Sequence, residues 1–308
     1  MSQTLVSPTR PATGSHCGRI AVIATHAFTQ LVRMKVFYFL AVFAVITIGS
    51  NFFDLPQHVG PEAAGTNVLN SIKSWSLGTM TLFSVVFAIV ATALLLPKDV
   101  EDRTLYTILA KPVPRVDYLA GKLLGVVLLV FVSLALMDVL MTAVLQIRTS
   151  MILSGQMEWA HSRNWSAAEI ASLRSDILSQ GPNVSLQGAV FVVFLRASIM
   201  ASLALFISTF STSTLFTSII SFLIYFIGHF QADARDVFLG AGAGWVTRVI
   251  SLLVALVLPD FHLFNEFDAV IQGQVMPLML LGKLTGIGMF YAGFYLIVSW
   301  FIFAGKEF

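Results

Sequence analysis

A small set of side chains near the C-terminal end of the sequence has a spacing that metal sites use. His262 and Glu266 lie four residues apart in the stretch "PDFHLFNEFD", so a helix there would place both on one face. No third soft ligand stands nearby, and Pro259 makes a helix at this point uncertain. Helix capping and solvation is the better interpretation, and the sequence predicts no metal site.

Two further charged residues, Asp138 and Arg196, interrupt long apolar runs. A charge inside a membrane is costly in free energy, and such residues usually face a partner group or an aqueous path. Asp138 stands about 20 residues into one run and Arg196 about 10 into the next, which gives similar depths at ~1.5 Å per residue if the helices are antiparallel. They form a candidate intramembrane pair, either in a substrate path or as a structural ion pair, unless Arg196 lies nearer the outer surface.

The remaining sequence lacks catalytic machinery of its own. No nucleophile–base set is recognisable, and no G-x-x-x-x-G-K-[ST] loop is present; Gly121-Lys122 and Gly282-Lys283, for example, are followed by Leu. The single cysteine, Cys17, excludes an intrachain disulfide and a cysteine metal cluster. A net charge of +2 without a basic stripe gives no support for nucleic-acid binding.

The elements that position these residues are membrane helices. The chain is 57% hydrophobic and 11% charged, whereas soluble domains carry about 25% charged residues. Apolar runs long enough to cross a bilayer recur along it. We therefore expect an all-α, polytopic membrane protein with six transmembrane helices. The predicted spans are about 34–50, 75–96, 118–145, 186–207, 212–230 and 275–304.

The segments around the spans complete one membrane domain, expected over 18–308, behind a disordered cytosolic tail at 1–17. Residues 19–33 form an amphipathic pattern typical of a helix in the membrane interface, although an ordinary cytosolic amphipathic helix fits as well. Its apolar face comprises Ile20, Ile23, Ala24, Ala27, Phe28 and Leu31.

Two segments are expected on the outer side. The polar insert 146–185 contains a capping box, Ser166 to Glu169, and predicts a short helix lying on the membrane surface. Residues 245–258 are apolar but too short for an ordinary span, so we expect a re-entrant outer helix between the fifth and sixth spans. Lys and Arg are more numerous on the side that holds both termini, which predicts that both ends are cytosolic. If 245–258 were a full span, the C-terminus would be outside.

The densest charge lies between the second and third spans, and its pattern predicts a helix over about 98–111. Pro97 precedes it, acidic residues occupy its first turn, and Pro112 and Pro114 end it. A polar helix with a few apolar side chains, held at the inner face, is suited to docking a soluble partner. A solvated charged loop is the alternative. The residues concerned are Asp99, Glu101, Asp102, Arg103, Leu105, Ile108 and Leu109.

The stretch "EDRTLYTILAKPVPRVDYLAGKLLG" resembles the cytosolic loop of permeases of the ABC-2 type exporter family. The shared features are an acidic start, the Thr104-Leu105 pair, a "K-P-V-x-R" step at 111–115 and the "Y-L-x-G-K" pattern at 118–122. "LFISTF" at 205–210 and "LPDFHLFN" at 258–265 add to the likeness. The C-terminal "FIFAGKEF" departs from it, since paired arginines often stand there in the family.

The resemblance implies a mechanism. The charged helix would couple the spans to a separate ATPase subunit, which would bind ATP and Mg²⁺, and a second permease copy would complete the transport path in a cell membrane, expected to be a bacterial inner membrane. This chain would bind no cofactor. The alternative function is a membrane anchor that transmits ATPase motion to lipids or envelope proteins without moving a solute. A secondary transporter would need midplane carboxylates and broken helices, which the sequence does not show.

Overall fold

The computed structural model describes residues 16–33, 38–49, 61–101, 114–211, 213–231, 244–246, 257–265 and 267–305. Within these ranges every regular element is a helix, in agreement with the expected all-α fold. The helices are α1 (His16–Arg33), α2 (Tyr38–Gly49), α3 (Pro61–Glu101), α5 (Arg115–Ser162), α6 (Ala167–Ser179), α7 (Val184–Ser208), α8 (Thr214–His229), the 3₁₀ turn η1 (His262–Phe264), α11 (Phe267–Ile271) and α12 (Leu278–Ala304).

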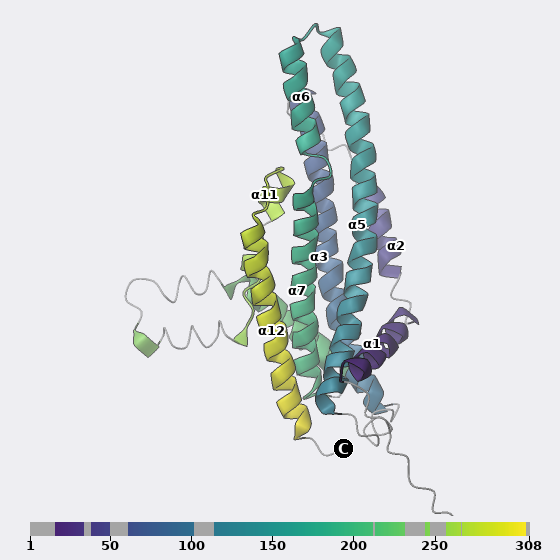
Figure 1. The fold of residues 1–308 in the computed structure, drawn as a ribbon, viewed down its shortest axis with the longest axis vertical. Helices are drawn as coiled ribbons and strands as arrows, with labels where there is room; N and C mark the ends of the chain where they lie inside the picture. Colours follow the sequence, from purple (N-terminus) through teal and green to yellow (C-terminus); the bar gives the residue numbers. More distant parts are fainter. Residues whose placement is uncertain are drawn as a thin grey trace, which may run out of the picture.

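The bundle is built from long helices that run side by side along its length (Figure 1). α7 lies at its centre, packed against α3, α5, α8 and α12, and most of its residues are buried. Four apolar stretches of the described chain are long enough to cross a membrane, at 67–95, 115–162, 167–208 and 278–304. These overlap the second, third, fourth and sixth predicted spans. An apolar run of this length can satisfy its backbone in a membrane only as a helix.

The other two predicted spans are described as shorter helices. α2 has 12 residues and α8 has 16, below the roughly 20 that a bilayer needs. Residues 34–37 and 50–60, which flank α2, lie outside the described residues. Residues 247–256 of the expected re-entrant helix also lie outside them. The count of six spans therefore stays a prediction.

The two ends of the bundle differ in shape (Figure 1). At one end, here called the basal end, lie α1, the end of α3, the start of α5 and the end of α12. At the other, the apical end, α5 and α6 form a helical hairpin that extends beyond the other helices. The 48 residues of α5 rise about 72 Å at ~1.5 Å per residue, more than the thickness of a bilayer.

This hairpin corrects the expectation for the insert 146–185. α5 continues through Ser162 without a break, and α6 packs along α5 instead of standing apart as a surface helix. Leu173 and Ile177 of α6 are buried, which explains why the helix pairs with α5. The predicted capping box is confirmed: Ser166 Oγ accepts a hydrogen bond from the Glu169 amide, and the Glu169 carboxylate accepts one from the Ser166 amide.

The apical ends of three segments are held together by a buried lysine. Lys73 of α3 donates hydrogen bonds to Gln180 Oε1, at 2.7 Å, and to the carbonyl of Ile271. Gln180 Nε2 in turn donates to the carbonyl of Gln272, at 2.9 Å. Gly273 follows with a positive φ of 83° and lies so close to Gln180 that a side chain would collide with it. The chain between α11 and α12 is thereby fixed to α3 and α6.

Candidate functional site at the base of the charged loop

The two helices that flank the charged loop are joined by a buried ion pair. Lys122 Nζ of α5 lies 2.7 Å from Asp99 Oδ2, near the end of α3, and the two side chains are only 2% and 6% exposed. Tyr118 Oη donates a hydrogen bond to the same carboxylate oxygen. An ion pair with this burial is costly to break from one side, typically about 3–5 kcal/mol, because a charge is left without compensation. The two flanks of the loop are therefore joined by a buried contact.

α1 is attached to the same turn of α5. Asp117, which is buried, accepts a hydrogen bond from Arg19 Nε at 3.0 Å, and His16 Nδ1 lies 3.0 Å from the same oxygen. One carboxylate at the start of α5 therefore holds two residues of the first turn of α1. This also places the acidic residue at the helix start, where it complements the helix dipole.

Two glycines of α5 bring the backbones of α1 and α5 into contact. A Cβ added to Gly125 would lie 2.6 Å from Ala27 Cβ and 2.8 Å from the Ala24 carbonyl, and one added to Gly121 would lie 2.7 Å from Ile23 Cβ. The spacing Gly121-x-x-x-Gly125 is the small-residue pattern that permits close helix crossings in membranes. The predicted apolar face of α1 is confirmed, since Ala27 and Leu31 are fully buried.

The end of α12 is bound by the first residue of α5. Arg115 donates hydrogen bonds to the carbonyls of Phe303 and Ala304, at 2.6 and 2.7 Å. These are carbonyls of the last helical turn, which lack partners within α12 and favour a nearby cation. Tyr118 also stacks on Phe303, with ring centroids 6.0 Å apart. The first two turns of α5 thus bind α1, α3 and α12, and we call this set of contacts the basal joint.

Comparison with known protein families identifies the chain. The family model described as ABC-2 family transporter protein matches residues 21–233, which include most of the basal joint and the whole charged loop. The chain belongs to the ABC-2 transporter family. A search of curated proteins returns no match. The family is one of membrane components of ABC transporters, which agrees with the apolar helices of the bundle.

The structure revises the start of the helix that was predicted over about 98–111 in the charged loop. α3 runs through Pro97 to Glu101, so residues 98–101 form the last turn of the span rather than the first turn of a separate helix. Pro97 removes one backbone hydrogen bond, but α3 packs tightly on both α5 and α7, and this tertiary packing keeps the helix continuous.

The predicted docking residues fall into two groups. Asp99 is buried within the basal joint, so it faces α5 and not a soluble partner. Glu101 ends α3. The rest of the set, for which docking stays a prediction, lies outside the described residues: Asp102, Arg103, Leu105, Ile108 and Leu109.

The candidate pair of Asp138 and Arg196 is not formed among the described residues. Asp138 accepts a hydrogen bond from Gln187 Nε2 at 3.1 Å, in the first turn of α7. Arg196 lies nine residues further along α7, about 13 Å deeper at ~1.5 Å per residue. The sequence estimate failed because it took α5 to end near residue 145, whereas Asp138 stands near the middle of a much longer helix.

Arg196 instead anchors the stretch before α11. Its guanidinium donates to the carbonyls of Phe264 and Phe261, at 2.6 and 3.3 Å, and stacks over the Phe267 ring at 5.4 Å. The Phe261 amide donates to the Gly228 carbonyl at the end of α8. The "LPDFHLFN" stretch is therefore held against the bundle at the level of Arg196, with Phe261 and Phe264 buried and Leu263 exposed. Sequence reasoning missed this role because a buried arginine can be satisfied by carbonyls of a non-helical segment that no local pattern reveals.

No group of three or more His, Cys, Asp or Glu that could hold a metal ion occurs in the part of the chain that the structure describes. Asp260 Oδ1 accepts a hydrogen bond from the His262 amide at 3.0 Å, which is a turn cap of the kind expected for this stretch. Glu266 lies outside the described residues.

Proposed function

We propose that this ABC-2 family membrane protein is the permease subunit of an ATP-driven exporter. A separate ATPase subunit binds ATP and Mg²⁺ and moves the charged loop, and the spans respond by moving a substrate across the membrane. Two permease copies form the path. Both termini and the basal end face the cytosol. The observation that supports this proposal best is the basal joint, because it ties both flanks of the loop to α1 and α12.

The basal joint transmits a displacement of the loop to the helices that flank it. The Asp99–Lys122 pair and the Tyr118 hydrogen bond prevent α3 and α5 from separating when the loop is displaced. A force on residues 102–113 is then delivered to both spans as a rigid-body movement, the usual way in which packed helices transmit small shifts. Through Arg115 and Asp117 the same movement reaches α12 and α1.

The experiment is co-purification of the ATPase with the full-length chain from membranes. The double variant Glu101→Ala with Leu105→Asp is expected to lose at least nine-tenths of the bound ATPase while still inserting into the membrane. Glu158→Ala, an exposed acidic residue near the apical end of α5, serves as the matched control and is expected to retain it.

If the double variant keeps its ATPase, the assignment of the loop as the docking element is wrong. A second measurement separates the exporter from the alternative of a mechanical membrane anchor. In proteoliposomes, an exporter hydrolyses ATP faster when its solute is present and accumulates that solute, whereas an anchor hydrolyses ATP without net transport.

A further inference from the structure

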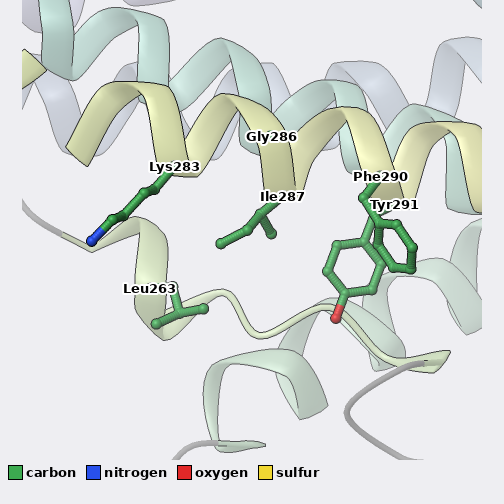
Figure 2. A pocket seen from close by; sticks show the side chains of 6 residues that line it. All are labelled: Leu263, Lys283, Gly286, Ile287, Phe290 and Tyr291. Carbon is green, nitrogen blue, oxygen red and sulfur yellow. The ribbon is translucent and has the colours of Figure 1, made fainter. Parts of the chain in front are cut away.

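A groove opens on the side of α12 where η1 approaches it (Figure 2). It has a volume of about 540 Å³. Five of its residues come from α12 and one from η1. They are Lys283, Gly286, Ile287, Phe290, Tyr291 and Leu263. Figure 2 shows the Lys283 and Ile287 side chains pointing from α12 toward the segment that carries Leu263.

The groove has one charged group, and that group stands at one end of it. Lys283, Ile287 and Phe290 follow one another at spacings of four and three residues, so they form a single stripe along α12. Lys283 is exposed, and no ion pair involves it among the described residues. The Tyr291 hydroxyl is already used, since it donates to the Leu258 carbonyl at 3.3 Å. Apart from Lys283, the walls of the groove are therefore apolar.

The position of Lys283 along α12 corresponds to the level of lipid headgroups. It precedes Ala304 by 21 residues, which is about 32 Å at ~1.5 Å per residue, and the hydrocarbon core of a bilayer is about 30 Å thick. Ala304 is the residue that Arg115 holds at the basal end. With α12 crossing the bilayer, the lysine stands at the apical surface and the apolar stripe runs inward from it.

We infer that this groove binds one phospholipid with an anionic headgroup from the apical leaflet. The ammonium of Lys283 pairs with the phosphate, which carries the net negative charge of the headgroup, and an acyl chain lies along Ile287 and Phe290 over the open face of Gly286. The order of the groove's groups along the bilayer normal matches that of a lipid: the cation lies at headgroup level, and the apolar walls lie at acyl-chain level. A peptide would leave backbone donors and acceptors without partners against these apolar walls. The inference does not depend on the identity of the ATPase or of the exported substrate.

The test uses native mass spectrometry of the full-length chain, titrated with phosphatidylglycerol or with phosphatidylcholine of the same acyl chains. The wild type is expected to retain one phosphatidylglycerol more tightly than phosphatidylcholine. Lys283→Gln is expected to weaken phosphatidylglycerol binding about fivefold, the usual effect of one cation near an anionic surface, and to weaken phosphatidylcholine binding much less, because the choline cation offsets the charge of its phosphate.

A second variant tests the apolar part of the groove. A Cβ on Gly286 meets nothing within 4 Å, so Gly286→Phe fills the groove without disturbing the helix and is expected to weaken binding of both lipids at least fivefold. Gly78→Phe is the matched control, because Gly78 of α3 is exposed and equally open. Arg174→Gln on α6 is the control for Lys283→Gln, because it removes a cation elsewhere at the apical end. The inference is overturned if Lys283→Gln binds like the wild type, if either control reproduces the effect, or if the wild type shows no preference between the lipids.

Discussion

At the scale of single residues, the basic side chains inside the bundle have different kinds of partner. Lys122 pairs with a carboxylate, whereas Lys73 and Arg196 are bound by amide and carbonyl oxygens. Removing one partner of the Lys122 pair leaves a buried charge without compensation, which is costly. This charge–charge contact lies at the base of the charged loop, where the proposed function requires movement to be transmitted.

A double-mutant cycle tests the Asp99–Lys122 pair. Lys122→Met leaves the buried Asp99 carboxylate without its cation, and we expect a loss of about 3–5 kcal/mol in stability. At roughly 2–4 °C per kcal/mol, the thermal midpoint of the purified chain falls by about 10 °C. Adding Asp99→Asn keeps an acceptor for Tyr118 but removes the stranded charge, so most of the lost midpoint is expected to return.

In the same cycle, we expect transport activity and thermal stability to respond differently in the double variant. The double variant restores folding but not the ion pair, so ATPase-driven transport in proteoliposomes is expected to remain below that of the wild type. Transport at the wild-type rate by the thermally restored variant would show that the pair only stabilises the fold.

At the scale of elements, α1 is held by shape as much as by charge. Gly121 and Gly125 remove the side chains that would separate the two backbones, and Arg19 and Asp117 fix the register of the crossing. Neither feature alone defines both the distance and the rotation of α1. α1 is thus part of the basal joint.

Enlarging Gly125 tests this contact. In Gly125→Ala the new Cβ would meet Ala27 and the Ala24 carbonyl below 3 Å, and backbone cannot yield as a side-chain end can, so we expect a loss of about 1–3 kcal/mol. A fluorophore on Cys17, the chain's single cysteine, would report increased mobility of α1. Gly155→Ala on the same helix, where a Cβ meets nothing within 4 Å, is expected to change neither signal. Equal effects of the two substitutions would contradict the close crossing.

At the scale of the whole molecule, the bundle has a compactly joined basal end and a projecting apical hairpin. α5 spans the full length between them and is long enough to leave the membrane at the apical side. The Trp159 and Trp165 rings meet edge to face at the tip, with centroids 5.3 Å apart, and close the hairpin. The two ends are therefore expected on opposite sides of the membrane.

Thiol labelling of intact cells or sealed vesicles tests this orientation. Cys17 is exposed at the basal end, so a membrane-impermeant reagent is expected to label it only from the cytosolic side. In a Cys17→Ser background, Ser162→Cys at the end of α5 is expected to be labelled only from the outside. Labelling of both positions from one side would refute the proposed topology.

The sequence by itself determined that the chain is a helical membrane protein with several long apolar helices, since apolar length alone decides which segments can cross a bilayer. Local signals also gave the α6 capping box and the buried face of α1, because both depend on residues within a few turns. The resemblance of the loop correctly indicated the family. These predictions need no knowledge of neighbouring helices.

Only the tertiary structure decided which charges meet. Asp99 was expected to face a partner and is buried against Lys122. The candidate partners Asp138 and Arg196 instead bind Gln187 and the carbonyls of Phe261 and Phe264, respectively. The length of α5 and the continuity of α3 through Pro97 likewise depend on packing with other helices. The physical reason is that a one-turn shift of one helix against another changes every contact between them, while the apolar pattern that places each helix in the membrane stays the same.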